Sequence, residues 1–355
     1  MRIGVNTLFL IPGEVGGSEV FTRALLDAVR QHRSAPELVL FTNEENHDTF
    51  AGYERVPTNV DASERIMRIL AEQFVLPRFV REQRVDILLS PGYTGPARCG
   101  CPRVVVTHDT QFLAHPEDFS FFERLAHRIF VGGSAWAADH ILTPTEFSKR
   151  EIETRLKIDS NLVTVIGEAP DPTYFDPQPC DRRTPFLLYV ANTYPHKNAQ
   201  RLVSAFATIA DRIPHDLVIV GKARGGEPSS HPRVVRLSGL SDRELCGLYH
   251  ACALYVSPSL YEGFGLPVTE AMAAGARLVL ADAATHRELA EDCATYFDPR
   301  DEHGIANAIL DALAEPESVR DSLRAMAIAR AQQFSWEATA GRVMGALQQA
   351  LAEHR

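Results

Sequence analysis

Short β-branched segments alternate with amphipathic segments of ten or more residues along most of this 355-residue chain. Such alternation is typical of βαβ units, in which the strands form a parallel sheet, so the chain is predicted to be α/β. The first half is expected to contain strands at 2–6, 37–42, 85–89, 103–107 and 162–166, and helices at 18–31, 64–83, 119–138 and 145–157. The second half is expected to contain strands at 186–191, 217–220, 234–237, 254–257 and 277–280, helices at 198–212, 242–250, 267–274 and 304–314, and a helical tail from residue 318.

Residues 168–185 interrupt this alternation. The stretch contains five prolines and no periodic segment, so it is predicted to be an interdomain linker. Single hydrophobic cores stop growing near about 250–300 residues, which favours two cores in a chain of this length. We therefore expect two doubly wound, Rossmann-like domains that face a central ligand cleft.

Charge and cysteine content exclude several classes of protein. The net charge is −10, with 18 basic and 23 acidic residues in 1–170 and the same numbers in 171–355, so nothing favours DNA or RNA as a partner. No apolar run reaches the roughly 18 residues that a membrane-spanning helix needs. The six cysteines do not form a disulfide framework, and Cys99 and Cys101 have no second pair at zinc-site spacing. The N-terminus lacks a secretory cleavage pattern, and we expect the protein in a reducing cytoplasm.

The most informative segment is SPSLYEGFGLPVTEAMAAG, residues 257–275. A strand is expected to end at its start, and a loop with Gly263 and Gly265 follows. Pro267 is expected at the first helical position, where its missing N–H would be unpaired anyway. Leu266, at the expected cap position, has no side-chain oxygen, so free N–H groups are left to bind an anion.

Two glutamates flank this helix start: Glu262 on the loop and Glu270 in the expected first helical turn. A carboxylate at Glu270 suits a neighbouring diol, since it can accept two hydrogen bonds from ribose hydroxyls. The alternative is that Glu262 is a solvated loop charge and that Glu270 stabilises the helix dipole. The glycines, the proline and the missing cap favour the ligand interpretation.

The sequence EGFGLPVTE resembles the E-x7-E signature of the retaining GT-B glycosyltransferases of family 4. Three further motifs occur in the order found in that family, and the resemblance extends from Arg2 to about Trp336. These motifs are Gly16-Gly17-Ser18-Glu19 after the first strand, Thr107-His108-Asp109 at the end of a later strand, and Pro195-His196-Lys197-Asn198 after the linker.

The resemblance implies a GT-B fold and an activity. The implied reaction moves a hexose or deoxyhexose, such as mannose, from a nucleotide-diphosphate donor to a hydroxyl acceptor, with retention at the anomeric carbon. The nucleotide sugar is a co-substrate, and no cofactor is expected. The acceptor would belong to polysaccharide, glycolipid or secondary-metabolite glycoside synthesis, and lipid-linked acceptors are common in the family.

The resemblance also assigns roles to residues. Glu262 and His108 are expected at the transferred sugar, and the base is expected near residues 238–240. Lys197 would neutralise the donor diphosphate as the sugar leaves. The predicted catalytic residues are His108 and Glu262, and the predicted donor-binding residues are Gly16, Gly17, Lys197, Lys222, Leu240, Gly263, Phe264, Gly265, Leu266 and Glu270.

Two of these residue sets have structural alternatives. The loop around Gly16 and Gly17 lets backbone N–H groups approach a phosphate or sugar, but it could also be a plain tight turn. It does not read G-x-G-x-x-G, and Asn43 rather than an acidic residue ends the second strand, which disfavours a dinucleotide cofactor. His108 ends a very apolar strand and so could line the crevice, or it could be a core histidine bonded to backbone.

The phosphate site departs from the family pattern. Many relatives carry an arginine where this chain has Asn192 or Thr193, and Lys222 or Arg224 is the candidate to replace it. No Asp-x-Asp pair occurs anywhere in the sequence, so the chemistry is expected to be independent of metal.

Two other segments carry expectations. Residues 65–84 hold five arginines among apolar residues, which indicates either a basic surface that meets anionic lipid or a helix with a solvated arginine face. In the family the last helix returns to the first domain, and Val343, Leu347 and Leu351 form an apolar stripe that needs a partner. The expected domains are therefore 1–170 with 336–355, and 171–335.

Two other functions remain open on the sequence alone. One is another nucleotide-sugar enzyme on the same scaffold, an epimerase or a phosphorylase. The other is a protein that binds a nucleotide sugar without turnover. Fold analogy does not decide between them.

Overall fold

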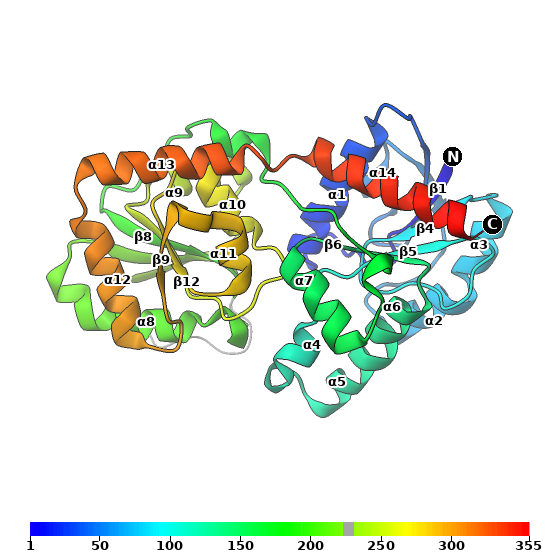
Figure 1. Ribbon diagram of the computed structural model, residues 1–355, viewed down its shortest axis with the longest axis horizontal. Coiled ribbons are helices and arrows are strands. Elements are labelled where there is room, and N and C mark those ends of the chain that lie inside the picture. The colour runs from blue at the N-terminus through cyan, green and yellow to red at the C-terminus, as the bar shows by residue number, and fades with distance from the viewer. Residues whose placement is uncertain (193, 223–230, 355) are drawn as a thin grey trace. The chain divides into compact units, whose positions relative to one another are not determined.

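The computed structural model describes residues 1–192, 194–222 and 231–354, and the chain divides into two compact units (Figure 1). Unit 1 comprises Met1–Glu168 and Trp336–Arg355, and unit 2 comprises Ala169–Ser335. Among the residues described, no helix is both long and apolar enough to cross a membrane.

Unit 1 is built on a seven-stranded parallel sheet. Its strand order is β3-β2-β1-β4-β5-β6-β7, so the direction of winding reverses between β1 and β4. The strands are β1 (Arg2–Asn6), β2 (Glu37–Thr42), β3 (Glu54–Pro57), β4 (Ile87–Ser90), β5 (Arg103–Val106), β6 (His140–Thr143) and β7 (Val163–Val165). The helices are α1 (Gly17–Arg30), α2 (Arg65–Phe74), α3 (Leu76–Glu82), α4 (Gln111–Ala114), α5 (Phe121–His127), α6 (Gly133–Ala137), α7 (Glu146–Glu151) and α14 (Trp336–Glu353), with short 3₁₀ helices η1 (His47–Phe50), η2 (Pro116–Asp118) and η5 (Ser160–Leu162) and π-helical turns η3 (Arg128–Gly132) and η4 (Ile152–Leu156).

Unit 2 repeats the same plan with a six-stranded parallel sheet. Its order is β10-β9-β8-β11-β12-β13, and the reversal falls between β8 and β11. The strands are β8 (Phe186–Val190), β9 (Asp216–Val220), β10 (Val234–Leu237), β11 (Leu254–Ser257), β12 (Leu278–Ala281) and β13 (Ala294–Phe297). The helices are α8 (Ala199–Ile209), α9 (Asp242–Ala251), α10 (Leu266–Ala273), α11 (Ala284–Ala290), α12 (Glu302–Ala314) and α13 (Glu317–Ala331), with 3₁₀ helices η6 (Pro172–Phe175), η7 (Pro195–Lys197), η8 (Ala210–Arg212) and η9 (Glu291–Cys293).

Both faces of the unit 2 sheet are buried, which explains why its strands read as continuous apolar runs. Consecutive side chains of β8 point to opposite faces: Leu187 packs with α8 and α12, and Leu188 packs with α9 and α10. The sheets in both units are thus the doubly wound α/β type that the alternation predicts. Ligands of such sheets bind outside the carboxyl ends of the strands, at the point where the strand order reverses.

The last helix, α14, packs on unit 1. Val343 and Leu347 are fully buried in one core with Ile3 and Leu25, and Leu351 lies at the edge of that core. The burial of two side chains four residues apart accounts for the apolar stripe on this helix.

Several sequence predictions need correction. Residues 168–185 are not a free linker, because Tyr174 on η6 is buried in the unit 2 core. The helix expected at 64–83 is broken into α2 and α3 at Val75, since Pro77 has no N–H to continue the hydrogen-bond ladder. Strands β3, β6 and β13 and helix α11 were not predicted.

Candidate active site

The β11–α10 loop and the start of α10 form the centre of the unit 2 site. Helix α10 begins at Leu266, its cap is Gly265, and Pro267 is the second helical residue, so the predicted cap position was one residue too late. Gly265 adopts φ 98°, a left-handed conformation that favours glycine. No described side chain caps the helix, which leaves this N-terminus available to an anion.

Glu270 lies farther along the helix than predicted. It is the fifth residue of α10 rather than part of the first turn, so its carboxylate is separated from the helix N-terminus. The buried Tyr249 hydroxyl on α9 donates a 2.8 Å hydrogen bond to Glu270 Oε2. Burial raises the pKa of the Glu270 carboxyl to about 7, and the neighbouring Asp242 and Asp171 add to that shift. Tyr249 was not predicted to be part of the site, because it is 21 residues from Glu270 in the sequence.

Lys197 and Glu262 form an ion pair. The Lys197 Nζ lies 2.6 Å from Glu262 Oε2, and the two side chains are only 20% and 13% exposed. Burial alone would raise the pKa of the Glu262 carboxyl, but the Lys197 ammonium holds that pKa below its ordinary value. Two side chains predicted separately for the diphosphate and the sugar are therefore in contact in unit 2.

The backbone around Lys197 is fixed by its neighbours. Lys197 ends η7 rather than opening α8, and Asn198 follows with a left-handed φ of 58°. The Asn198 amide donates hydrogen bonds to the carbonyl oxygens of Pro258 and Pro299, at 3.1 and 2.8 Å. These bonds tie the loop that carries Lys197 to the segments that follow β11 and β13. Asn198 therefore positions Lys197, a role that the sequence motif 195–198 did not assign to it.

The remaining donor residues predicted in unit 2 lie at different depths. Gly263 is on the β11–α10 loop. Phe264 turns its ring into the core, where it meets Phe334 edge-on. Leu240 packs at the edge of the same core, and the Lys222 side chain is exposed while its amide donates to Asn192 Oδ1. The candidates Thr193 and Arg224 lie outside the described residues.

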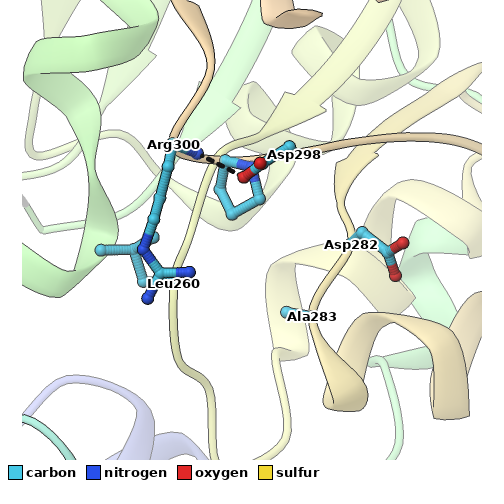
Figure 2. Close-up of a pocket in the computed structure, with 6 residues that line it drawn as sticks. Leu260, Asp282, Ala283, Asp298 and Arg300 are labelled. Atoms are coloured by element: carbon cyan, nitrogen blue, oxygen red, sulfur yellow. Dashed lines mark hydrogen bonds between the residues drawn. The ribbon is translucent and has the colours of Figure 1, made fainter.

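A pocket of about 310 Å³ lies at the carboxyl ends of β11, β12 and β13 (Figure 2). Polar groups dominate it, and Arg300 N donates to Asp298 Oδ1 at 2.8 Å. Its lining residues are Leu260, Asp282, Ala283, Asp298, Pro299 and Arg300. No sequence motif marks this pocket, because its members come from three separate loops.

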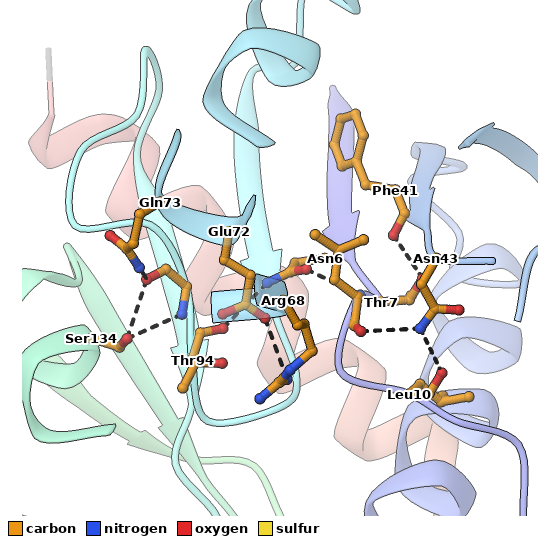
Figure 3. A network of polar contacts seen from close by, with 12 residues as sticks. Asn6, Thr7, Leu10, Phe41, Asn43, Arg68, Glu72, Gln73, Thr94 and Ser134 are labelled. Carbon is orange, nitrogen blue, oxygen red and sulfur yellow. Dashed lines mark hydrogen bonds and ion pairs between the residues drawn. The ribbon is translucent and has the colours of Figure 1, made fainter. Parts of the chain in front are cut away.

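In unit 1, a glycine-capped helix follows β1. Gly16 adopts φ 60° as the cap of α1, and a Cβ on Gly17 would meet open space. The buried Asn43 donates to the carbonyl oxygens of Leu8 and Leu10, which holds the loop between β1 and α1 in place (Figure 3). Asn43 thus has a structural function where dinucleotide-binding folds place an acidic residue.

His108 is buried at the end of β5 with both ring nitrogens engaged. Its Nε2 donates to the Pro91 carbonyl at 3.0 Å, and its Nδ1 lies 3.4 Å from Glu168 Oε1. The Phe21 and Tyr93 rings pack against the imidazole. A sugar hydroxyl would have to replace one of these partners. Glu168 was not predicted to be part of the site, although it opens the proline-rich segment.

No group of three or more His, Cys, Asp or Glu side chains suited to a metal occurs within 1–192, 194–222 and 231–354. The six cysteines are free thiols.

Solved structures of glycosyltransferases have the same fold. Sucrose-phosphate synthase from Thermosynechococcus elongatus matches over 100% of both chains with a TM-score of 0.77 at 19% identity. The Anabaena Alr3699/HepE structure in complex with UDP and glucose matches 98% of this chain and 100% of that chain, with a TM-score of 0.73 at 18% identity. Two Rossmann-like units with these neighbours define a protein with the GT-B fold.

Family models and relatives give the narrower assignment. The model "Glycosyltransferase Family 4" matches residues 15–173, and "Glycosyl transferases group 1" matches residues 171–334. The chain belongs to these family 4 glycosyltransferases, as the E-x7-E resemblance implied.

The curated relatives include mannosyltransferases. The chain is 28% identical to O-antigen chain mannosyltransferase B of Escherichia coli over 73% of each protein. It is 26% identical to O-antigen chain mannosyltransferase RfbU of Salmonella typhimurium, over 61% of this chain and 62% of that protein. A match to the serotype-specific mannosyltransferase WbdA of Escherichia coli, 32% identical, covers 44% of this chain but only 20% of that longer protein.

Proposed function

We propose that the protein transfers mannose from a nucleotide-diphosphate donor to a hydroxyl acceptor, with retention at the anomeric carbon and without a metal ion. Two named relatives act in O-antigen chains, which supports an acceptor in polysaccharide or glycolipid synthesis. A lipid-linked acceptor would place the reaction at the cytoplasmic face of a membrane, with residues 65–84 near the lipid.

The observation that carries the proposal is the Lys197–Glu262 pair beside the uncapped start of α10. Lys197 and the helix N-terminus both favour negative charge, so together they hold the diphosphate and stabilise it as it leaves. Glu262 accepts hydrogen bonds from hydroxyls of the donor sugar, and Glu270 accepts them from the ribose. Gly16, Gly17 and His108 are the proposed contribution of unit 1.

Nucleotide release from a panel of nucleotide sugars tests the proposal. We expect a nucleotide-diphosphate mannose donor to be hydrolysed fastest in the absence of acceptor, and we expect Glu262→Gln to abolish that hydrolysis. Glu317→Gln, at an exposed position at the start of α13, is the matched control and should behave as the native protein. Epimerised donor as the product would favour an epimerase, and tight binding without any turnover would favour a non-catalytic protein.

A further inference from the structure

Large exposed apolar side chains are concentrated on one part of unit 1. Fifteen such side chains occur among the residues described, and ten of them lie in 66–75 and 121–136. Phe74 and Phe122 are the most exposed, at 76% and 79%. The ten side chains are Ile66, Met67, Leu70, Phe74, Val75, Phe121, Phe122, Leu125, Ile129 and Trp136, and we call them the apolar surface.

The two segments of the apolar surface are neighbours in space. At one end, Arg65 on α2 lies 3.2 Å from the His127 ring on α5. At the other end, Gln73 donates to the Gly95 carbonyl, and the Ser134 hydroxyl of α6 contacts that same residue (Figure 3). Polar bonds therefore join the two segments at both ends, and each segment exposes five large apolar side chains, more than the single exposed residues that are normal on a protein surface.

The charges of these segments are positive in a protein whose net charge is −10. Residues 65–84 contain five arginines and two glutamates. Two of these arginines pair with the two glutamates, Arg68 with Glu72 in the interior and Arg78 with Glu82, which leaves three arginines in excess. Residues 121–136 add Arg124 and Arg128 against Glu123. The apolar surface is therefore bordered by basic groups, the composition that binds anionic lipid.

A groove of about 380 Å³ opens within this region and combines hydrocarbon with guanidinium groups. Its lining residues are Phe112, Leu113, Pro116, Phe121, Arg124, Leu125 and Arg128. The Arg124 Nε is buried and has no hydrogen-bond partner in the part of the chain that the structure describes. A buried N–H without a partner is costly, and a guanidinium is well matched to phosphate oxygens.

We propose that the apolar surface docks on a bilayer that contains anionic phospholipid, and that the Arg124–Arg128 groove receives the phosphate of one lipid. The apolar side chains enter the acyl region, and the flanking arginines meet the headgroups. A second copy of this chain is a poorer occupant, because it would bring two basic surfaces together. The sequence pointed only to residues 65–84, and the structure adds 121–136 and the groove. The proposal is separate from glycosyl transfer and needs no turnover.

Sedimentation with vesicles tests the docking. We expect the protein to bind phosphatidylcholine vesicles that contain phosphatidylglycerol, to bind pure phosphatidylcholine vesicles weakly, and to be released by high salt. The double variant Phe122→Ser, Leu125→Ser should bind at least about tenfold more weakly. The matched control is Val319→Ser, Met326→Ser, which removes two exposed apolar side chains from unit 2 and should bind as the native protein. Unchanged circular dichroism of each variant shows that the fold is intact.

The groove has its own test. Arg124→Gln, Arg128→Gln should reduce the preference for phosphatidylglycerol, while the arginines of 65–84 keep part of it, and an unchanged preference would overturn the role of the groove. Equal vesicle binding by native protein and the Phe122→Ser, Leu125→Ser variant would overturn the proposal. Binding of inorganic phosphate that depends on Arg124, without vesicle binding, would make the groove a phosphate site and overturn the docking. A dimer in light scattering that Phe122→Ser disrupts, again without vesicle binding, would identify a second copy as the occupant and would also overturn it.

Discussion

The Glu270 carboxyl predicts how donor affinity depends on pH. Burial raises the pKa of this group to about 7 in the free protein. In the proposed complex its carboxylate accepts hydrogen bonds from ribose hydroxyls, so the donor binds the ionised form and lowers the pKa. Affinity should therefore rise with pH as the fraction of ionised Glu270 rises.

The size of this effect follows from the pKa. A group with a pKa of about 7 is about one-tenth ionised at pH 6 and about nine-tenths ionised at pH 8. If only the ionised form binds, the Kd should fall about tenfold over this range, which is about 1.4 kcal/mol. About half a proton should be released per donor bound at pH 7.

Calorimetry with an intact nucleotide sugar measures both quantities. The intact donor is preferred because its diphosphate does not titrate near neutrality, whereas a free nucleoside diphosphate does. Titrations in two buffers with different ionisation enthalpies give the proton release. Glu270→Gln keeps an acceptor oxygen but does not titrate, so its affinity should be weaker and independent of pH. A flat affinity in the native protein, or an equal slope in Glu270→Gln, would refute the assignment of Glu270 to the ribose.

Three further predictions concern charge. Lys197→Met should weaken donor binding by about 1.5–3 kcal/mol, the range for a hydrogen bond to a charged group. Binding of the nucleoside alone, which has no diphosphate, should not change. Calorimetry with both ligands checks this, and an equal loss of affinity for donor and nucleoside would contradict it. Activity should survive EDTA, and loss that Mg²⁺ or Mn²⁺ restores would show that the site needs a metal. Burial raises the pKa of the Glu72 carboxyl, so this group loses its proton at a lower pH in the unfolded chain than in the folded state. The free energy of unfolding should therefore fall as pH rises from about 4.5 through the range between the two pKa values. Urea unfolding at several pH values should show a shallower fall for Glu72→Gln, and an unchanged slope would mean that Glu72 does not titrate on unfolding.

The sequence predicted most strands of both sheets because each is a short apolar run between helices. It missed β6, His140–Thr143, where a polar histidine begins a strand of only four residues. The sequence pattern also predicted one helix at 119–138 where the structure has α5 and α6. The π-helical turn Arg128–Gly132 between them adds residues without changing the apolar pattern that the prediction used.

For the site, motifs located the residues but not their partners. Tyr249 beside Glu270 and Glu168 beside His108 come from parts of the chain 21 and 60 residues away, brought together only by the winding of each sheet. The cap of α10 was misplaced by one residue, because glycine and leucine both lack a capping oxygen and only the φ of Gly265 distinguishes them. A local motif thus predicts which residue type stands at a position, whereas the side chains that contact it depend on the topology of the sheet.

The Lys197–Glu262 pair makes binding of the donor's diphosphate depend on binding of its sugar. Both charges are largely buried, and each is tolerated there because the other is 2.6 Å away. A diphosphate that takes the ammonium as its own counter-ion leaves Glu262 without a cation. The carboxylate must then find new donors, and the hydroxyls of the sugar attached to that diphosphate are the groups within reach in the proposed complex. A nucleoside diphosphate without a sugar supplies no such hydroxyls, so it would leave a buried carboxylate unpaired. The pair thus favours an intact nucleotide sugar over its nucleotide product, which is the order of affinities that a transferase needs to release product.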